Sequence, residues 1–271
     1  MALMALGINP SDGTSIDYIQ EILKGFDGTQ FGDVNLVNDD IFALLVLLKA
    51  GYQENEEPVA SALRFVLSSQ REQGSWGDAD MTAAAIQMLD LVASVKERDE
   101  VIAKATAYLE GKQESTGGFG NVYSTSWVLQ AISAMQGNGD TWIIDNRTPE
   151  HFLALRQALD GGLLQSESKE NRIWATSYAI PAVLGQSWGS VLHQFEKSTQ
   201  VQAKTFVPSV PSVDEKVLEE KEQEIVHISQ QVATLNVEVL VFTTLARMEK
   251  ELERIALETK AVQVGIVQFK I

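Results

Sequence analysis

Apolar residues recur in steps of three and four along most of the first 190 residues, which is typical of helices with one buried face. Four of these segments are rich in alanine or leucine, and we expect each to be buried on several sides: 39–50, 81–93, 125–135 and 174–184. Each follows another helical segment, at 16–24, 59–68, 101–111 and 149–159. The pattern therefore predicts an all-α fold built from helical hairpins.

A glycine-containing turn with one large apolar residue separates the two helices of each pair. The large residues are spaced by 45, 43 and 44 positions: Phe31, Trp76, Phe119 and Leu163. Gln70 and Gln113 precede the second and third of them by the same interval. Glycine permits positive φ and close backbone approach, and an aromatic side chain can fill the gap between successive hairpins. We expect Phe31, Trp76 and Phe119 to occupy equivalent places.

Polar residues mark the expected helix starts. Asn38, Asp80 and Ser124 are interpreted as N-caps of the second helices, and Thr148 followed by Pro149 as the start of a first helix. The opening residues 1–6 are interpreted as the last turns of a helix, so the chain is expected to begin inside a repeat. Together the segments predict about four and a half hairpins.

The repeat also carries a family resemblance. Residues 63–76, with Gln70, Gly74 and Trp76, resemble the QW motif of squalene and hopene cyclases, and residues 113–119 look like a second copy that is also similar to repeats of protein prenyltransferase β-subunits. Residues 142–188 resemble bacterial prenyltransferase/squalene-oxidase-repeat proteins. The resemblance covers about residues 1–195. It implies a partial α/α toroid of the terpenoid cyclase/protein prenyltransferase superfamily.

The resemblance also locates the candidate catalytic residues. Class II cyclases protonate an alkene with an aspartic acid in a D-x-D-D-T-A motif, and the similar segment here is 78–83. Asp80 stands at the place of the proton donor and Asp78 at that of the first aspartate, but Met81 replaces the last aspartate. A second copy at 38–40 lacks the first aspartate. The alternative interpretation is that these carboxylates cap helices.

The composition argues against a metal or cofactor site. The chain has no cysteine, so the Cys ligand of a prenyltransferase zinc is missing. His151, His193 and His227 do not have the spacing of metal ligands. No glycine-rich phosphate-binding loop is present either. We therefore expect neither a metal nor a cofactor.

Four aromatic residues are the candidate ligand-binding residues: Tyr123, Trp127, Trp174 and Tyr178. Trp127 and Trp174 fall early on the expected inner helices and are the preferred candidates for lining a cavity. Such a cavity would suit an apolar or planar ligand. The alternative interpretation is that these rings only pack between helices.

The overall charge and hydropathy narrow the range of partners. The net charge of −16 disfavours nucleic acid, because phosphate binding requires a basic face. The longest apolar run, 41–48, has eight residues, far fewer than the roughly 20 of a membrane span. Localisation stays open. Export is suggested only by the family resemblance.

The C-terminal region has a different pattern. Residues 196–213 contain two prolines and predict a linker, and residues 214–260 predict one helix of roughly 70 Å. Apolar residues follow in alternating steps of three and four, typical of a coiled coil: Ile225, Ile228, Val232, Leu235, Val239 and Phe242. We expect self-association through this seam, with docking onto the toroid as the alternative. Residues 262–271 fit either a helix or a strand.

These observations favour a non-enzymatic binding or interaction module on a toroid scaffold, tethered or oligomerised by a coiled coil. Its expected partners are a second copy of the chain and an apolar small molecule or a protein. One alternative is a terpenoid-cyclase-like enzyme that uses Asp80 as its acid. A second is a small-molecule carrier similar to cobalamin carriers, by analogy of fold alone.

Overall fold

A computed structural model describes residues 1–137, 142–164 and 167–198. Within these ranges the protein is all-α, with ten helices and no strand. The predicted coiled-coil helix, its six apolar positions from Ile225 to Phe242 and the segment 262–271 lie outside the described residues, as does the linker beyond Ser198. They stay predictions.

Eight of the helices form four hairpins. Each hairpin has a first helix and a second helix, as follows: α2 (Tyr18–Leu23) and α3 (Val37–Lys49), α4 (Val59–Ser68) and α5 (Ala79–Asp90), α6 (Arg98–Glu110) and α7 (Val122–Ala134), and α8 (Pro149–Ala154) and α9 (Lys169–Val183). Two helices of four residues each, α1 (Ala2–Ala5) and α10 (Trp188–Val191), precede and follow them. All eight predicted segments coincide with a helix, although α8 ends five residues earlier than expected.

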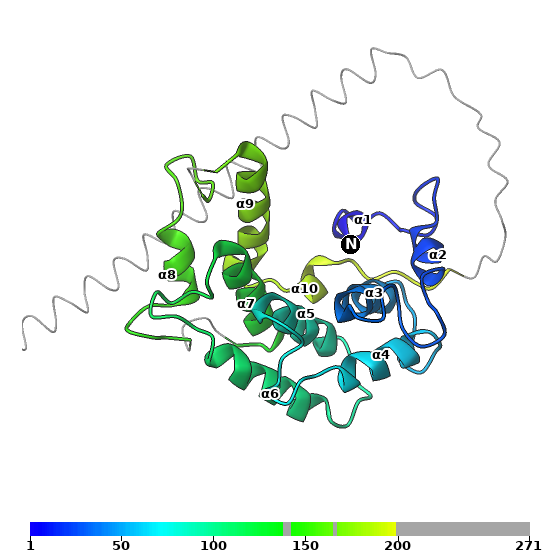
Figure 1. The fold of residues 1–271 in the computed structure, drawn as a ribbon. Coiled ribbons are helices and arrows are strands. Elements are labelled where there is room, and N and C mark those ends of the chain that lie inside the picture. The colour runs from blue at the N-terminus through cyan, green and yellow to red at the C-terminus, as the bar shows by residue number, and fades with distance from the viewer. Residues whose placement is uncertain (138–141, 165–166, 199–271) are drawn as a thin grey trace, which may run out of the picture. The chain divides into compact units, whose positions relative to one another are not determined.

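The second helices of the hairpins form a curved row. Contacts run from α3 to α5, from α5 to α7 and from α7 to α9, while α4, α6 and α8 lie on the outside of the curve (Figure 1). We call the row the inner helices. Their inner face is the side turned away from α4, α6 and α8, and α10 contacts α5 and α7 there.

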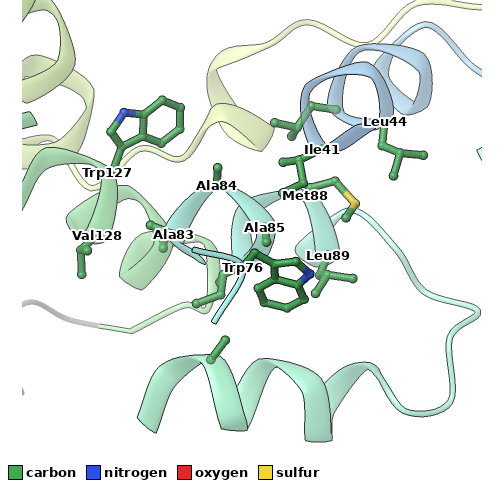
Figure 2. Close-up of a cluster of buried hydrophobic side chains, with 14 of the residues drawn as sticks. Ile41, Leu44, Trp76, Ala83, Ala84, Ala85, Met88, Leu89, Trp127 and Val128 are labelled. Atoms are coloured by element: carbon green, nitrogen blue, oxygen red, sulfur yellow. The ribbon is translucent and has the colours of Figure 1, made fainter. Parts of the chain in front are cut away.

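Among the inner helices, α5 and α7 are buried on almost every side, whereas α9 buries only Ala175, Ala179 and Ala182. In α5 every residue from Thr82 to Leu89 is buried, whereas α6 buries only Ala105 and Leu109. The small side chains of Ala83, Ala84 and Ala85 let α5 fit between two neighbouring helices. Figure 2 shows Ala84 and Trp127 on one side of α5 and Trp76 on the opposite side. The alanine-rich composition is therefore explained by close packing on several sides.

The large residue of each turn is held in the same way in all four hairpins. Phe31, Trp76, Phe119 and Leu163 are each less than 5% exposed. Their main-chain N–H groups donate to a side-chain oxygen of the following inner helix: Phe31 to Asp40 (2.8 Å), Trp76 to Thr82 (3.3 Å), Phe119 to Thr125 (3.0 Å) and Leu163 to Thr176 (3.0 Å). The predicted equivalence of Phe31, Trp76 and Phe119 is confirmed.

A glutamine joins the second and third turns to the segment of the chain that follows each hairpin. The Nε2 of Gln70 donates to the carbonyl oxygens of Gly74 (2.9 Å) and of Val101 (2.9 Å) on α6. Gln113 repeats both bonds, to Gly117 (3.0 Å) and to Trp142 (2.8 Å). The fourth hairpin has a glutamine at the same position, which was not predicted from the sequence. Gln157 repeats the bond within the turn, donating to the Gly161 carbonyl oxygen at 2.9 Å.

Two turn glycines cannot be replaced, because the following outer helix is too close. Gly74 (φ +94°) lies against the carbonyl of Lys104 in α6. A Cβ on Gly117 (φ +84°) would come within 2.5 Å of the Thr148 carbonyl oxygen, at the start of α8. The second and third turns are thus each buried by the hairpin that follows.

The expected N-caps Asn38, Asp80 and Ser124 are wrong. The inner helices begin two or three residues earlier, directly after the turn glycine in α5 and α7, and α3 has no side-chain cap. Asp78 caps α5 by accepting from the Met81 N–H at 2.9 Å, and Asn121 caps α7. The expected start at Thr148 and Pro149 is confirmed, with a capping box between Thr148 and His151.

Asp40 stands where the other three hairpins have threonine. It is fully buried, its Oδ1 accepts the bond from Phe31, and its Oδ2 has no hydrogen-bond partner among the described residues. Burial raises the pKa of this carboxyl from 3.8 to about 6. The Phe31 bond opposes this rise, and the charge of Asp39 adds to it.

We predict that Asp40→Thr stabilises the protein at pH 8 and has lost this advantage at pH 4. Because the folded-state pKa of Asp40 is the higher one, the ionised carboxylate destabilises the fold above about pH 6, and this effect disappears as pH falls toward 3.8. The difference between the two values limits the gain to roughly 3 kcal/mol. Urea unfolding at both pH values measures it. The matched variant Thr82→Asp should show the opposite pH dependence, and an equal gain at both pH values would contradict the assignment.

Candidate functional site on the inner face

An aromatic cluster forms at one repeated position of the inner helices. The residues two positions after Asp40, Thr82, Thr125 and Thr176 are Phe42, Ala84, Trp127 and Tyr178. The Trp127 ring lies 5.9 Å from that of Phe42 and 5.6 Å from that of Tyr178, between ring centroids. Ala84 leaves the space on α5 in which Phe42 and Trp127 meet. The repeat thus gathers residues from three helices into one surface.

Trp188 of α10 completes this cluster. Its ring lies 5.9 Å from that of Trp127, and its main-chain N–H donates to Oε1 of Gln87 at 2.9 Å. Trp127 is therefore in contact with rings from α3, α9 and α10, and only 9% of it stays exposed. At one edge Tyr123 lies 6.1 Å from Tyr178, and its hydroxyl donates to the Asn171 carbonyl.

The chain after α9 runs back across the inner face. We call residues 187–197 the strap. The His193 N–H donates to the Met4 carbonyl (3.2 Å), and the Phe195 N–H donates to the Lys49 carbonyl (2.8 Å). The Gln194 side chain donates to the Leu48 carbonyl at 3.0 Å. Carbonyls at the end of a helix have no partner within it, so the strap supplies donors that the end of α3 needs.

The far end of the strap is fixed by a cation. Lys197 pairs with Glu56, and its ammonium group lies 4.4 Å from the centre of the Tyr52 ring. Gly51 (φ +89°) lets the strap pass closely, since a Cβ there would come within 2.5 Å of the Lys197 nitrogen. Beside this crossing, Tyr52, Leu91 and Gln194 help line a cleft of about 200 Å³. The strap therefore leaves a cleft open beside the C-terminal ends of α3 and α5.

Two glutamines at equivalent positions connect the inner helices. Gln87 and Gln130 are both fully buried and stand five residues after Thr82 and Thr125. Nε2 of Gln130 donates to the Tyr178 carbonyl at 2.9 Å, and Gln87 makes a longer bond of 3.5 Å to the Trp127 carbonyl. The Oε1 of Gln87 accepts from Trp188. That of Gln130 is buried without a hydrogen-bond partner among the described residues.

Asp80 lies in the first turn of α5, facing α7. Burial raises the pKa of this carboxyl, a hydrogen bond from the Ser124 side chain lowers it, and the nearby charge of Asp78 raises it. Asp78 itself is exposed and caps the helix. Asp80 is thus in a setting that favours a neutral acid. The motif's last aspartate, which would assist it, is replaced by Met81.

The structure brings together three of the four predicted ligand-binding residues: Tyr123, Trp127 and Tyr178. Trp174 lies apart from them and is 67% exposed. The prediction missed Phe42, Gln87 and Trp188. Phe42 could have been found from the sequence, because it stands at the same position of its repeat as Trp127. Trp188 lies outside the repeats, so no repeated pattern indicates it.

The described ranges contain neither a metal-binding cluster nor a membrane-spanning helix. No group of three or more His, Asp or Glu side chains there could hold a metal ion. No helix in the same part of the chain is long and apolar enough to cross a bilayer.

Comparison with known proteins adds no relative. A scan against protein-family models gives no match, and searches of curated proteins and of solved structures give none either.

We predict that Trp127→Ala destabilises the protein by about 3–5 kcal/mol, because it empties the centre of the aromatic cluster. Trp174→Ala removes the same side chain from an exposed position and should change stability by no more than about 0.5 kcal/mol. Guanidinium unfolding of the full chain, followed by circular dichroism, measures both. Equal losses in the two variants would show that Trp127 is not the centre of the packing.

Proposed function

We propose that the helical hairpins are part of an α/α toroid of the terpenoid cyclase/protein prenyltransferase kind, acting as a non-enzymatic binding or interaction module. The support for the toroid is the curved row of inner helices and the turns that repeat one hydrogen bond four times. Self-association through the C-terminal coiled coil is part of the same proposal and rests on the heptad pattern alone.

One observation carries the binding function: the inner face already holds a segment of the chain by its aromatic cluster. Trp188 contacts Trp127, and Gln87 accepts the Trp188 N–H. Indole is a planar apolar group with a large contact area. The surface of Phe42, Trp127 and Tyr178 therefore has the chemistry to bind a planar apolar group from elsewhere.

The rival function is cyclisation with Asp80 as the acid. The raised pKa of Asp80 favours it, because a general acid must be protonated at the working pH. Two features weigh against it. Met81 takes the place of the assisting aspartate, and the strap covers α5 and α7, where a substrate would have to lie.

We predict that 3-methylindole, the free form of the tryptophan side chain, stabilises Trp188→Ala. The substitution leaves an apolar space next to Trp127 that the free indole can fill. At ten times its Kd a ligand adds roughly 1.4 kcal/mol to the folded state. Thermal unfolding with and without 3-methylindole measures the effect. Trp174→Ala lacks one tryptophan as well and is the control. No shift, or the same shift in both variants, would count against binding at the inner face.

We also predict that the wild-type chain does not convert squalene or prenyl diphosphates. The reason is the incomplete acid motif at 78–83. Product analysis by gas chromatography after long incubation is the measurement. Turnover that disappears in Asp80→Asn, with the fold intact by circular dichroism, would establish the cyclase-like enzyme instead.

A further inference from the structure

The strap is bound to the inner face as a ligand would be bound. We propose that it occupies the site to which a partner protein binds through a segment of similar sequence. The partner is a protein with an accessible segment that carries one tryptophan, followed by apolar residues and a cation. It binds the inner face when it displaces the strap. This inference rests on the proposed binding function and names the partner of the same site.

The strap makes its contacts through a few separated anchors. Trp188 enters the aromatic cluster, Leu192 is 2% exposed, Phe195 donates its N–H to the end of α3, and Lys197 pairs with Glu56. The residues between these anchors, such as His193 and Glu196, are exposed. Alternation of anchors with exposed residues is typical of a bound peptide segment, whose specificity lies in a few pockets. The expected partner segment therefore has the order tryptophan, leucine, phenylalanine and lysine at the spacing of the strap.

Two features at the start of the strap limit the sequence of the partner segment further. A Cβ on Gly189 would come within 2.9 Å of a terminal methyl group of Leu91, so a small residue after the tryptophan fits without moving that side chain. Ser187 is 6% exposed, and its hydroxyl caps α10 by accepting from the Ser190 N–H. The partner segment therefore begins with a capped helical turn, and its tryptophan stands at the first position of that turn.

The inner face has an acceptor that the strap leaves unused. Gln87 uses its side-chain oxygen to accept the Trp188 N–H. Gln130 occupies the same position one repeat later, and its Oε1 is fully buried with no hydrogen-bond partner among the described residues. The indole Nε1 of Trp188 is also buried without a partner in this part of the chain. The resident segment thus leaves an acceptor and a donor unmatched, and a partner segment that matches either one binds better than the strap does.

Competition with the strap sets the conditions for binding. A tethered segment acts at an effective concentration of the order of millimolar. A free segment with the same intrinsic affinity for the inner face therefore cannot displace it at micromolar concentration. The exposed residues from Leu184 to Gln186, with Gly185 at φ +67°, are the point from which the strap can swing away. Removal of the Lys197 and Trp188 side chains should therefore release the strap and make the inner face accessible.

The test uses the full chain and a fluorescein-labelled peptide with the sequence of residues 185–198. The released variant carries Trp188→Ala and Lys197→Ala, which remove two strap anchors and leave the inner helices unchanged. Fluorescence anisotropy should show the peptide binding the released variant at least tenfold more tightly than the wild type. A peptide with alanine in place of its tryptophan should bind the released variant at least tenfold more weakly. Gln87→Met in the released variant removes the N–H acceptor at similar volume, and it should weaken binding to a similar extent.

Controls keep the outcomes distinct. Near-ultraviolet circular dichroism and stabilisation of Trp188→Ala by 3-methylindole establish that the aromatic cluster is intact. If 3-methylindole stabilises that variant and the peptide does not bind the released variant, the partner inference is wrong while the proposed function stands. If 3-methylindole fails as well, both are wrong.

A second copy of the chain is the competing occupant. The measurement is light scattering in a Val232→Asp/Leu235→Asp background, which removes the predicted coiled coil as a source of association. A dimer that Trp188→Ala abolishes would show that copies exchange straps with one another, and this result would overturn the partner inference. A monomer in that background, together with tight peptide binding by the released variant, supports it.

Discussion

Burial of the second and third turns, each by the hairpin that follows it, is the constraint on which the rest of the structure depends. At Gly74 and Gly117 the backbone of the following outer helix leaves no room for a side chain, and Gln70 and Gln113 fasten each turn to that hairpin. The second and third hairpins therefore depend on their successors to bury their turns. Like other repeat proteins, the chain gains stability mainly from contacts between neighbours, and the inner helices are held side by side as a consequence.

The features that recur in every repeat, namely the turns and the helices, could be predicted from the sequence. The turns could be located because Trp76 and Phe119 need glycine and a burying neighbour at a fixed spacing, and the helices followed from their apolar period. The caps were misplaced because Asp80 and Ser124 are as good capping residues as Asp78 and Asn121, and only the end of the glycine turn decides between them. The strap could not be found at all. Its contact between Gln87 and Trp188 joins residues 101 positions apart, which no local pattern encodes.

Equivalent positions show how the repeat has been adapted to form a surface. The position of Trp127 is phenylalanine in α3, alanine in α5 and tyrosine in α9, so large rings from three helices meet over one small residue. The position of Gln87 is glutamine again in α7, leucine in α3 and proline in α9, at Pro181. Side-chain hydrogen bonds between inner helices through this position are thus made only by α5 and α7, the two middle helices of the row. The same backbone geometry yields packing at some repeats and polar contacts at others.

The strap also bears on the choice between binding and catalysis. A cyclase needs an inner face that is open to an apolar substrate and shielded from water, with its acid directed into that space. Here the face is covered by a segment that is held through main-chain N–H groups as well as by Trp188 and Leu192. Main-chain donors are common to every peptide and absent from hydrocarbon substrates. The acceptors at Gln87, Lys49 and Met4 bind main-chain N–H groups of the strap, and this agrees better with the proposed binding of a polypeptide than with cyclisation of a terpenoid.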